Sequence, residues 1–212
     1  MKYRKIPEET IHRLPVYLQG LLFLSSQGRQ NISSSKLAHI LHLNPSQIRK
    51  DFSYFGGFGV RGIGYDVEKL LNQVRNILKL NQLHKTALVG VGNLGSAMLK
   101  YPGFQKYGFE IVAAFDSDPQ KIGKTKNKIV VEDISKLDTL KARGIQIAIL
   151  AVPSQVVQEL VDKLVEAGIV GILSFAPSQL TVPKKVKVIN INIAMDLARL
   201  PYYLPAIKAA KQ

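Results

Sequence analysis

The chain has 212 residues, 46% of them hydrophobic, which is enough for two small domains or one large one. No apolar run approaches the roughly 18 residues that span a bilayer, and the first residues lack the apolar segment of a signal peptide, so we expect a cytoplasmic protein without a membrane partner. The absence of cysteine excludes disulfides, thiolate metal sites and a thiol-based redox switch, and we predict no metal site.

The net charge of +14 is concentrated toward the N-terminus. Residues 1–85 carry 13 basic and 5 acidic side chains, whereas residues 86–212 carry 16 basic and 10 acidic ones. An excess of this density attracts a polyanion such as nucleic acid, because counterions are released from the phosphates on binding. On charge alone, a lysine-rich surface that only keeps the protein in solution remains the alternative.

The first part of the chain predicts a helix-turn-helix arrangement. Residues 8–26 place apolar side chains at helical spacing. One of the serines from Ser33 to Ser35 is positioned to cap a second, short helix. Pro45 then suits the first turn of a third helix. Two short helices joined by a tight turn are typical of DNA-binding domains.

The third helix has one apolar and one polar face. Ile48, Phe52 and Phe55 share the apolar face, because they lie four and three residues apart. The side chains left to point outward suit base edges and phosphates, and they are Ser46, Gln47, Arg49, Lys50, Ser53 and Tyr54. An ordinary solvated helix face has a similar composition, so this prediction depends on the segment that follows.

That segment, residues 55–65, carries five glycines among aromatic and β-branched residues. It predicts a tight β-hairpin with Arg61 near its tip. A helix-turn-helix followed by such a hairpin is a winged helix, whose wing can lay its arginine along the DNA backbone or into the minor groove. An amphipathic helix over residues 66–82 follows, so we place the DNA-binding domain at residues 1–82.

From residue 83 on, strand and helix patterns alternate, which predicts an α/β fold with a Rossmann-like, doubly wound parallel sheet. A short buried strand leads into a glycine-rich loop that opens a helix. The loop consists of Gly90, Val91, Gly92, Asn93, Leu94 and Gly95. Its glycines permit a sharp turn, close approach of backbone to a pyrophosphate, and close packing of the helix, whose N-terminus faces the phosphates.

A second apolar run after this helix ends in Asp116, 24 residues beyond Gly92. At this position of a dinucleotide-binding unit, a carboxylate accepts from the adenine ribose hydroxyls of NAD. It also repels the extra phosphate of NADP. We therefore predict an NAD-binding domain over residues 83–190, with a Rossmann core whose nucleotide site is empty or different as the alternative.

Later loops leave the carboxyl ends of predicted strands, where α/β sheets bind their ligands, and they add Val152, Pro153, Ala176 and Pro177 to the predicted cofactor site. All four histidines precede the glycine-rich loop, and these loops carry Ala, Val, Pro, Ser and Gln. A lysine could still transfer a proton. The scarcity of such groups nevertheless favours a domain that binds a dinucleotide without turning it over, and so a protein that is not an enzyme.

The final segment, residues 191–212, places apolar residues on one side of a helix without a remaining strand to cover them. A partner subunit is the natural place for this face, and Pro201 and Pro205 should break or kink the helix. A helix that folds back on its own domain is the alternative.

These segments together resemble the Rex family of redox-sensing transcriptional repressors. The matching stretches cover most of the chain and are residues 13–17, 46–56, 58–65, 90–95, 101–104, 116–119, 151–153, 175–177 and 201–204. The resemblance implies a homodimer whose C-terminal helix swaps onto the partner and a palindromic operator of double-stranded DNA. It also implies binding of both NAD⁺ and NADH, with release of DNA when NADH replaces NAD⁺.

The resemblance further assigns the DNA contacts to the outward residues of the third helix and to Arg61, and the dinucleotide contacts to the glycine loop and Asp116. It places Tyr101 in the switch linked to the nicotinamide, with a half-buried loop aromatic as the alternative. The family's switch also pairs an arginine of the first helix with an aspartate that opens the C-terminal helix. The matching positions here hold Gln19 and Asn192, with Asp196 as a rival for the second.

With these matches an amide pair replaces a charge pair, and the weaker hydrogen bond predicts weaker coupling between NADH and DNA. Two other functions stay open. One is an NAD-dependent oxidoreductase with an appended basic domain. The other is a DNA-binding module whose Rossmann domain holds a different ligand, such as coenzyme A or NADP.

Overall fold

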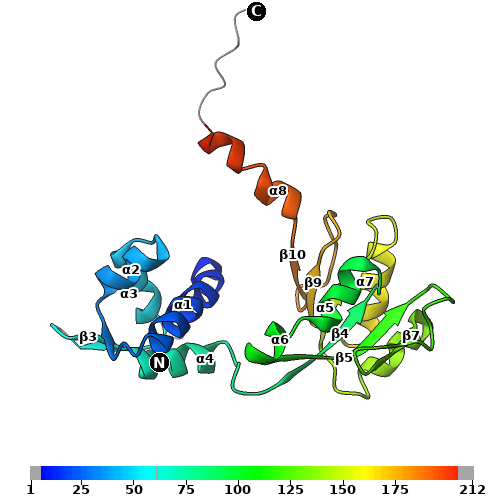
Figure 1. Cartoon of the computed structure of the whole chain (residues 1–212), viewed down its shortest axis with the longest axis horizontal. Coiled ribbons are helices and arrows are strands. Elements are labelled where there is room, and N and C mark those ends of the chain that lie inside the picture. The colour runs from blue at the N-terminus through cyan, green and yellow to red at the C-terminus, as the bar shows by residue number, and fades with distance from the viewer. Residues whose placement is uncertain (1–5, 61, 205–212) are drawn as a thin grey trace, which may run out of the picture. The chain divides into compact units, whose positions relative to one another are not determined.

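A computed structural model describes residues 6–60 and 62–204. The chain divides into two compact units, one ending at Gln82 and the other beginning at Leu83 (Figure 1). Within the described ranges, no helix combines the length and apolar character needed to cross a membrane.

Over its described residues, the first unit contains four helices and a small sheet. The helices are α1 (Glu8–Ser26), α2 (Ser34–Leu41), α3 (Pro45–Ser53) and α4 (Val67–Ile77). The antiparallel sheet has the order β1-β3-β2, formed by β1 (Asn31–Ile32), β3 (Gly64–Asp66) and β2 (Gly59–Val60). The hairpin of β2 and β3 is the predicted wing. Strand β1 was not predicted, because two residues carry no readable periodicity.

Local capping explains where the helices of the helix-turn-helix begin. The Ser33 hydroxyl accepts from the backbone N–H of Lys36 at 3.2 Å and caps α2. The Asn44 side chain accepts from the N–H of Ser46 at 2.8 Å, and Pro45 opens α3. Helix α3 ends at Ser53, short of the Phe55 that the apolar spacing included.

An aromatic cluster joins the parts of this unit. The Phe52 ring of α3 lies with its centroid 5.0 Å from that of Tyr17 on α1 and 5.5 Å from that of Tyr65 on β3. It also meets the Phe58 ring at 5.8 Å, edge to face. These contacts place the third helix, the first helix and the wing on one core.

The second unit is built on a seven-stranded sheet of order β10-β9-β8-β4-β5-β7-β6. The strands are β4 (His84–Val89), β5 (Phe109–Asp116), β6 (Thr125–Lys126), β7 (Ile129–Asp133), β8 (Ile147–Leu150), β9 (Gly171–Ser174) and β10 (Lys187–Asn190). All neighbours are parallel except β6 and β7. The predicted parallel sheet is confirmed, with the correction that an antiparallel edge strand, β6, is added through a tight turn at Asn127 and Lys128, both at positive φ.

The sheet has a hydrophobic core on each face, because successive strand residues point to opposite sides. Ala87 and Val89 of β4 pack in the core that includes α7 (Val157–Glu166), whereas Leu88 packs in the core that includes α5 (Asn93–Lys100). Both faces are covered, so the sheet is doubly wound as predicted.

Two short helical elements lie between strands of the second unit. The segment after Asp133 is a 3-10 helix, η1 (Ile134–Leu140), which Asp133 caps by accepting from the N–H of Ser135 at 2.7 Å. A one-turn helix, α6 (Gly103–Lys106), follows α5.

The C-terminal segment breaks into α8 (Ile193–Leu197) and η2 (Leu200–Tyr203), and Pro201 lies in the first turn of η2. Figure 1 shows α8 beyond the end of β10, standing away from the sheet. Its apolar side chains are largely exposed: Ile193 by 59%, Met195 by 60% and Leu197 by 58%. Pro205 lies outside the described residues.

Candidate functional sites

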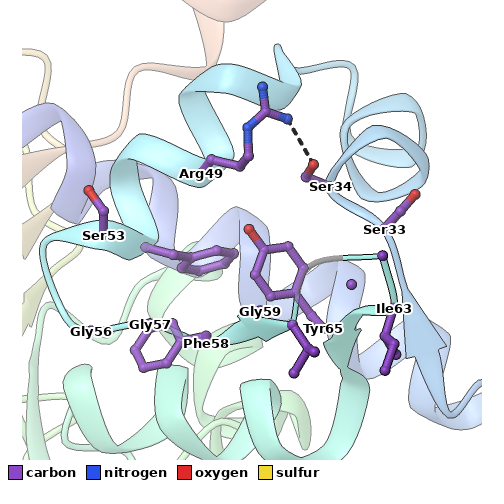
Figure 2. Close-up of a pocket in the computed structure, with 14 residues that line it drawn as sticks. Ser33, Ser34, Arg49, Ser53, Gly56, Gly57, Phe58, Gly59, Ile63 and Tyr65 are labelled. Carbon is purple, nitrogen blue, oxygen red and sulfur yellow. Dashed lines mark hydrogen bonds between the residues drawn. The ribbon is translucent and has the colours of Figure 1, made fainter.

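Helix α3 presents a polar face to solvent, where Ser46, Arg49, Lys50 and Ser53 are exposed. The Arg49 guanidinium donates to the Ser34 hydroxyl at the start of α2 at 2.9 Å (Figure 2). It also donates to the Ser46 hydroxyl at the start of α3 at 2.9 Å. Two hydroxyls from neighbouring helix starts therefore hold the guanidinium in a defined direction. A guanidinium oriented in this way suits bidentate recognition of guanine or phosphate.

Two residues of the predicted face depart from the expectation that they point outward. Gln47 is half-buried, and its amide nitrogen donates to the Asp51 carboxylate at 2.8 Å. Tyr54, at the end of α3, is also half-buried. The reason is the 3.6-residue period, which brings Gln47 one turn before Asp51 on the side of α3 that faces the core. Arg61 lies outside the described residues.

A hollow of about 520 Å³ separates α3 from the wing. Figure 2 shows Arg49 and Ser34 on one side of it and the glycine-rich segment and Tyr65 on the other. Burial raises the pKa of Tyr65, so its phenol stays neutral. A guanidinium, serine hydroxyls and glycine backbone around one hollow form a surface suited to a sugar-phosphate chain.

Asp51 is a residue that the sequence analysis did not single out. It is fully buried at 0% exposure, and its carboxylate accepts hydrogen bonds from Thr10, Arg13, Tyr17 and Gln47. Burial by itself raises the pKa of Asp51, but the bonds from Arg13, Tyr17, Gln47 and Thr10 outweigh it and lower the pKa to about 2. The signal in the sequence was an acidic residue inside an otherwise basic and apolar helix.

The second unit contains a cleft of about 720 Å³ at the carboxyl ends of its central strands, a size typical of small-molecule sites. Several predicted cofactor residues line it, namely Gly90, Gly92, Asn93, Leu94, Asp116, Val152 and Pro153. The lining also includes residues not predicted: Ser117, Asp118, Lys121, Ile134, Ala151, Val156, Glu159 and Leu160. Most of these follow the ends of β5 and β8, which is the signal that could have identified them.

Glycine is required at two points of the loop between β4 and α5. A Cβ on Gly95 would lie 2.0 Å from the carbonyl oxygen of Gly90, so no larger residue fits while the helix packs on the loop. Gly90 itself has φ +93 and faces the backbone of Ala151. Gly92, in contrast, has no atom of another described residue, apart from its two chain neighbours, within 4 Å of the Cβ position, which leaves its side open to a ligand.

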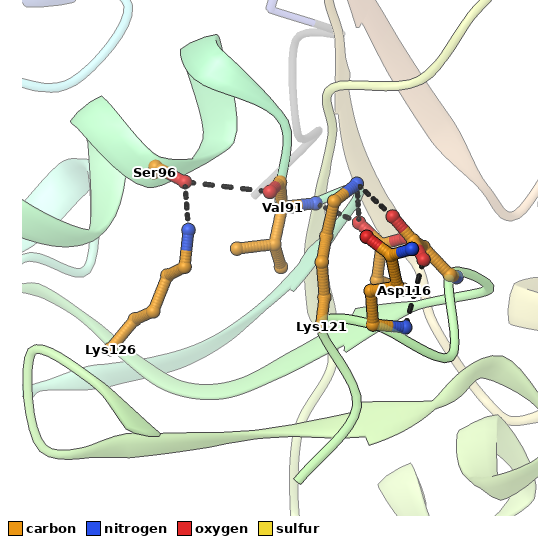
Figure 3. A network of polar contacts seen from close by, with 7 residues as sticks. Val91, Ser96, Asp116, Lys121 and Lys126 are labelled. Atoms are coloured by element: carbon orange, nitrogen blue, oxygen red, sulfur yellow. Dashed lines mark hydrogen bonds and ion pairs between the residues drawn. The ribbon is translucent and has the colours of Figure 1, made fainter. Parts of the chain in front are cut away.

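Asp116 connects this loop to the end of β5 (Figure 3). Its Oδ2 accepts from the backbone N–H of Val91 at 2.7 Å and from the Lys121 ammonium at 3.1 Å, and its Oδ1 accepts from the N–H of Asp118 at 2.9 Å. Burial raises the pKa of Asp116, but these donors outweigh it and hold the pKa below its ordinary value. The carboxylate is therefore ionised, oriented and only 7% exposed in the wall of the cleft.

The remaining predicted cofactor residues do not line the cleft. Val91 and Ala176 are buried, each with 1% exposure, and Gly95 is packed behind the loop. Pro177 is exposed after β9. Tyr101 is 56% exposed at the C-terminal end of α5. The length of α5 puts it about 12 Å along the helix axis from the glycine loop at the N-terminal end.

The two predicted switch residues besides Tyr101 lie in different units. Gln19 is exposed on α1. The Asn192 side chain accepts from the N–H of Met195 at 3.2 Å and so caps α8. Asp196, the rival position, forms an ion pair with Arg199 at 3.1 Å.

Comparison with known families agrees with both halves of this architecture. A family model described as "Putative DNA-binding protein N-terminus" matches residues 5–53, and one described as "CoA binding domain" matches residues 81–178. Proteins named redox-sensing transcriptional repressor Rex are similar over nearly the whole chain. That of Syntrophobacter fumaroxidans is 45% identical over 206 residues, covering 96% of this chain and 98% of its own. That of Desulfitobacterium hafniense is 45% identical over 203 residues, covering 95% and 97%.

Solved structures give the same result. A crystal structure of RSP in complex with β-NAD⁺ and operator DNA superposes with a TM-score of 0.88 at 36% identity, covering 94% of this chain and 93% of that one. RSP in complex with β-NADH gives a TM-score of 0.86 at 35% identity, covering 94% of each chain. RSP is described as a Rex-family repressor. The resemblance deduced from the sequence is confirmed: this chain belongs to the Rex family of redox-sensing transcriptional repressors.

Proposed function

We propose that this protein is a DNA-binding transcriptional repressor that senses the NADH/NAD⁺ ratio. As a homodimer it binds a palindromic operator of double-stranded DNA, and it releases this operator when NADH binds. The observation that carries the proposal is that one chain combines a winged helix-turn-helix with a glycine loop open to a ligand. Beside this loop lies the oriented carboxylate of Asp116, which is placed to accept hydrogen bonds from a ribose. The RSP complex with β-NAD⁺ and operator DNA, at a TM-score of 0.88, supports the proposal.

On the DNA side, α3 enters the major groove with Arg49 as its main contact to a base edge. The exposed Ser46, Lys50 and Ser53 share this face, and Gln47 and Tyr54 contribute from its margin. Arg61 of the wing adds a phosphate or minor-groove contact. Since phosphate contacts release counterions, operator affinity falls steeply with salt.

On the cofactor side, the residues present fit NAD⁺ and NADH. The open face of Gly92 and the N-terminus of α5 receive the pyrophosphate, and Asp116 receives the adenine ribose. The nicotinamide end extends toward Val152 and Pro153, with Ala176 and Pro177 on the next strand end. NAD⁺ and NADH differ there by a hydride and a positive charge.

The dimer and its switch follow from the C-terminal segment. The exposed apolar side chains of α8 and η2 pack on the partner subunit as a swapped helix, so that each cofactor contacts both subunits. The oxidation state then sets the angle between the subunits, and this angle decides whether two α3 helices reach major grooves about 34 Å apart. Only a difference in affinity for the two dimer shapes can drive this change. Tyr101, Gln19 and Asn192 are the residues we assign to it.

We expect the cleft to bind the dinucleotide without turning it over. We expect the protein to act in the cytoplasm, where the operator and the NAD pool are found. The lining that directly follows β8 consists of Ala151, Val152, Pro153 and Val156, which offer no proton-transfer group, and Glu159 beyond them binds Lys163. On the β5 side, the ionisable Asp116 and Asp118 both bind Lys121. An NAD-dependent oxidoreductase would turn over NADH in the presence of carbonyl substrates, and we expect no turnover.

The test is a titration of full-length protein against a labelled palindromic duplex, selected by the protein from a randomised pool, at fixed salt. We expect NAD⁺ to leave the complex intact and NADH to dissociate it, with a loss of affinity within the usual range of about 5- to 150-fold. Coenzyme A and NADPH serve as comparison ligands, because a family model named for CoA binding matches the second unit. Dissociation by coenzyme A but not by NADH would contradict the proposal, as would occupancy by NADH without any effect on DNA.

A further inference from the structure

Three side chains of α1 converge on one carboxylate of α3. Thr10 Oγ1 donates to Asp51 at 3.0 Å, Arg13 donates twice at 2.6 and 3.0 Å, and the Tyr17 hydroxyl donates at 2.5 Å. Thr10, Arg13 and Tyr17 are three and four residues apart, so they form one stripe along α1. Gln47 adds a donor at 2.8 Å from within α3. All five hydrogen bonds end on Asp51, which has no exposed surface.

This arrangement is a poor means of gaining stability but a good means of fixing an orientation. A buried ion pair often contributes no more stability than apolar side chains of the same volume would. The apolar neighbours Ile48 and Phe52 already hold α3 on the core, with 0% and 2% exposure. Apolar contact is non-directional. A forked, charged hydrogen bond joined by a phenol and a hydroxyl permits only one rotation of α3 about its axis.

We propose that Asp51 is a positioning residue for operator recognition: through Thr10, Arg13 and Tyr17 it fixes the rotation of α3, and so decides which bases the outward side chains can read. The inference rests on the proposed function and goes beyond it. At 100° per residue, Arg49 and Ser53 point about 160° away from Asp51, so Asp51 is at the back of the face that meets DNA.

The geometry predicts a loss of specificity rather than a loss of binding as such. Rotating α3 by about 10° moves a side-chain tip at about 6 Å from the axis by about 1 Å. Hydrogen bonds to base edges do not survive such a displacement. Attraction between Lys or Arg and phosphates does survive it, because the charges act over a screening length of about 10 Å. Base contacts specify the site, whereas phosphate contacts bind any sequence.

The experiment compares full-length wild type with Tyr17→Phe, with Thr10→Val/Tyr17→Phe and with Asp51→Asn on two labelled duplexes. One is the duplex that the wild type selects from a randomised pool, and the other is a scrambled duplex of the same length and composition. We expect affinity for the selected duplex to fall about tenfold for Tyr17→Phe and up to about a hundredfold for Asp51→Asn, while affinity for the scrambled duplex changes less than about twofold. For the double variant we expect a loss of affinity for the selected duplex between those of Tyr17→Phe and Asp51→Asn.

Glu9→Gln is the matched control, since it removes an exposed carboxylate from α1 and changes the charge of the first unit by the same amount as Asp51→Asn. It should leave the ratio of the two affinities unchanged. Tyr17→Phe keeps the buried volume and the Arg13 pair, so it tests the inference even if Asp51→Asn does not fold.

An unchanged affinity ratio in folded Tyr17→Phe and in the double variant would overturn the inference, as would an equal loss on both duplexes. These outcomes differ from failure of the proposed function, in which the wild type itself selects no sequence from the pool or does not respond to NADH.

Discussion

Asp51 and Asp116 are the two carboxylates that are buried among the described residues, and each accepts hydrogen bonds from several donors. Asp51 connects two helices of the first unit. Asp116 connects a backbone N–H of the glycine loop to the Lys121 ammonium and to its own turn in the second unit. In both cases burial opposes ionisation and the donors outweigh it, so each residue carries its charge at a position set by the fold.

The lowered pKa of Asp51 predicts a pH dependence of stability. Its pKa falls from the ordinary 3.8 to about 2 on folding, so its contribution is fully present above about pH 4 and is lost as pH falls through about 2. In urea unfolding of the first unit, followed through its tyrosines, we expect the deficit of Asp51→Asn relative to wild type to shrink by about 2 kcal/mol between pH 5 and pH 2. A deficit that stays constant over this range would show that the charge of Asp51 is not what its donors stabilise.

At the scale of elements, the loop between β4 and α5 combines two glycines with opposite surroundings. Gly95 is enclosed, since its Cβ would meet the Gly90 carbonyl at 2.0 Å, whereas among the described residues none besides the two chain neighbours lies within 4 Å of a Cβ on Gly92. One glycine therefore serves the packing of the helix on the loop. The other serves the approach of a ligand to the backbone.

This contrast predicts separable effects of two alanine substitutions. Gly92→Ala should leave the melting temperature of the second unit unchanged and weaken NADH binding at least about tenfold, because the methyl group occupies the space of the pyrophosphate. Gly95→Ala should lower the melting temperature and abolish NADH binding together, since α5 must move away from the loop. Fluorescence of bound NADH and thermal unfolding measure the two effects. Equal loss of stability in both variants would refute this division of roles.

At the scale of the whole molecule, the chain combines a DNA-reading unit with a cofactor unit and ends in a segment that its own sheet does not cover. Leu197, Leu200 and Leu204 are 58%, 56% and 66% exposed. Apolar side chains gathered on one short segment mark an interaction surface. The homodimer of the proposed function covers this surface and brings two α3 helices to one operator.

Leu197→Glu should therefore convert the dimer to monomers in sedimentation and lower operator affinity at least about a hundredfold, because two linked half-site contacts become independent. Val130→Glu is the matched control: Val130 is 51% exposed on β7, and its replacement should leave both dimer and affinity intact. A Leu197→Glu protein that remains dimeric and binds the operator normally would place the interface elsewhere.

Much of the fold was readable from local pattern. The 19-residue α1, the serine cap of α2, Pro45 in the first turn of α3 and the glycine hairpin all depend on neighbours within a few residues. The alternation of strand and helix patterns predicted the parallel sheet but not the order of its strands. The same holds for the glycine loop and Asp116, whose spacing alone located one wall of the cleft. The strands β1 and β6 could not be read, because each has only two residues and so carries no readable periodicity. The partner of β1 is moreover distant in sequence, since Asn31 pairs with Asp66.

The sequence by itself determined the family, the two kinds of unit and the position of the dinucleotide motif, since these reside in short strings of residues whose backbone demands are local. Only the tertiary structure decided that Gln47 turns inward, that Lys121 meets Asp116, and that Thr10, Arg13 and Tyr17 converge on Asp51. A helical period indicates which side chains share a face. It does not indicate which buried carboxylate that face will meet 34 to 41 residues away, because that pairing is made by the packing of one helix on another.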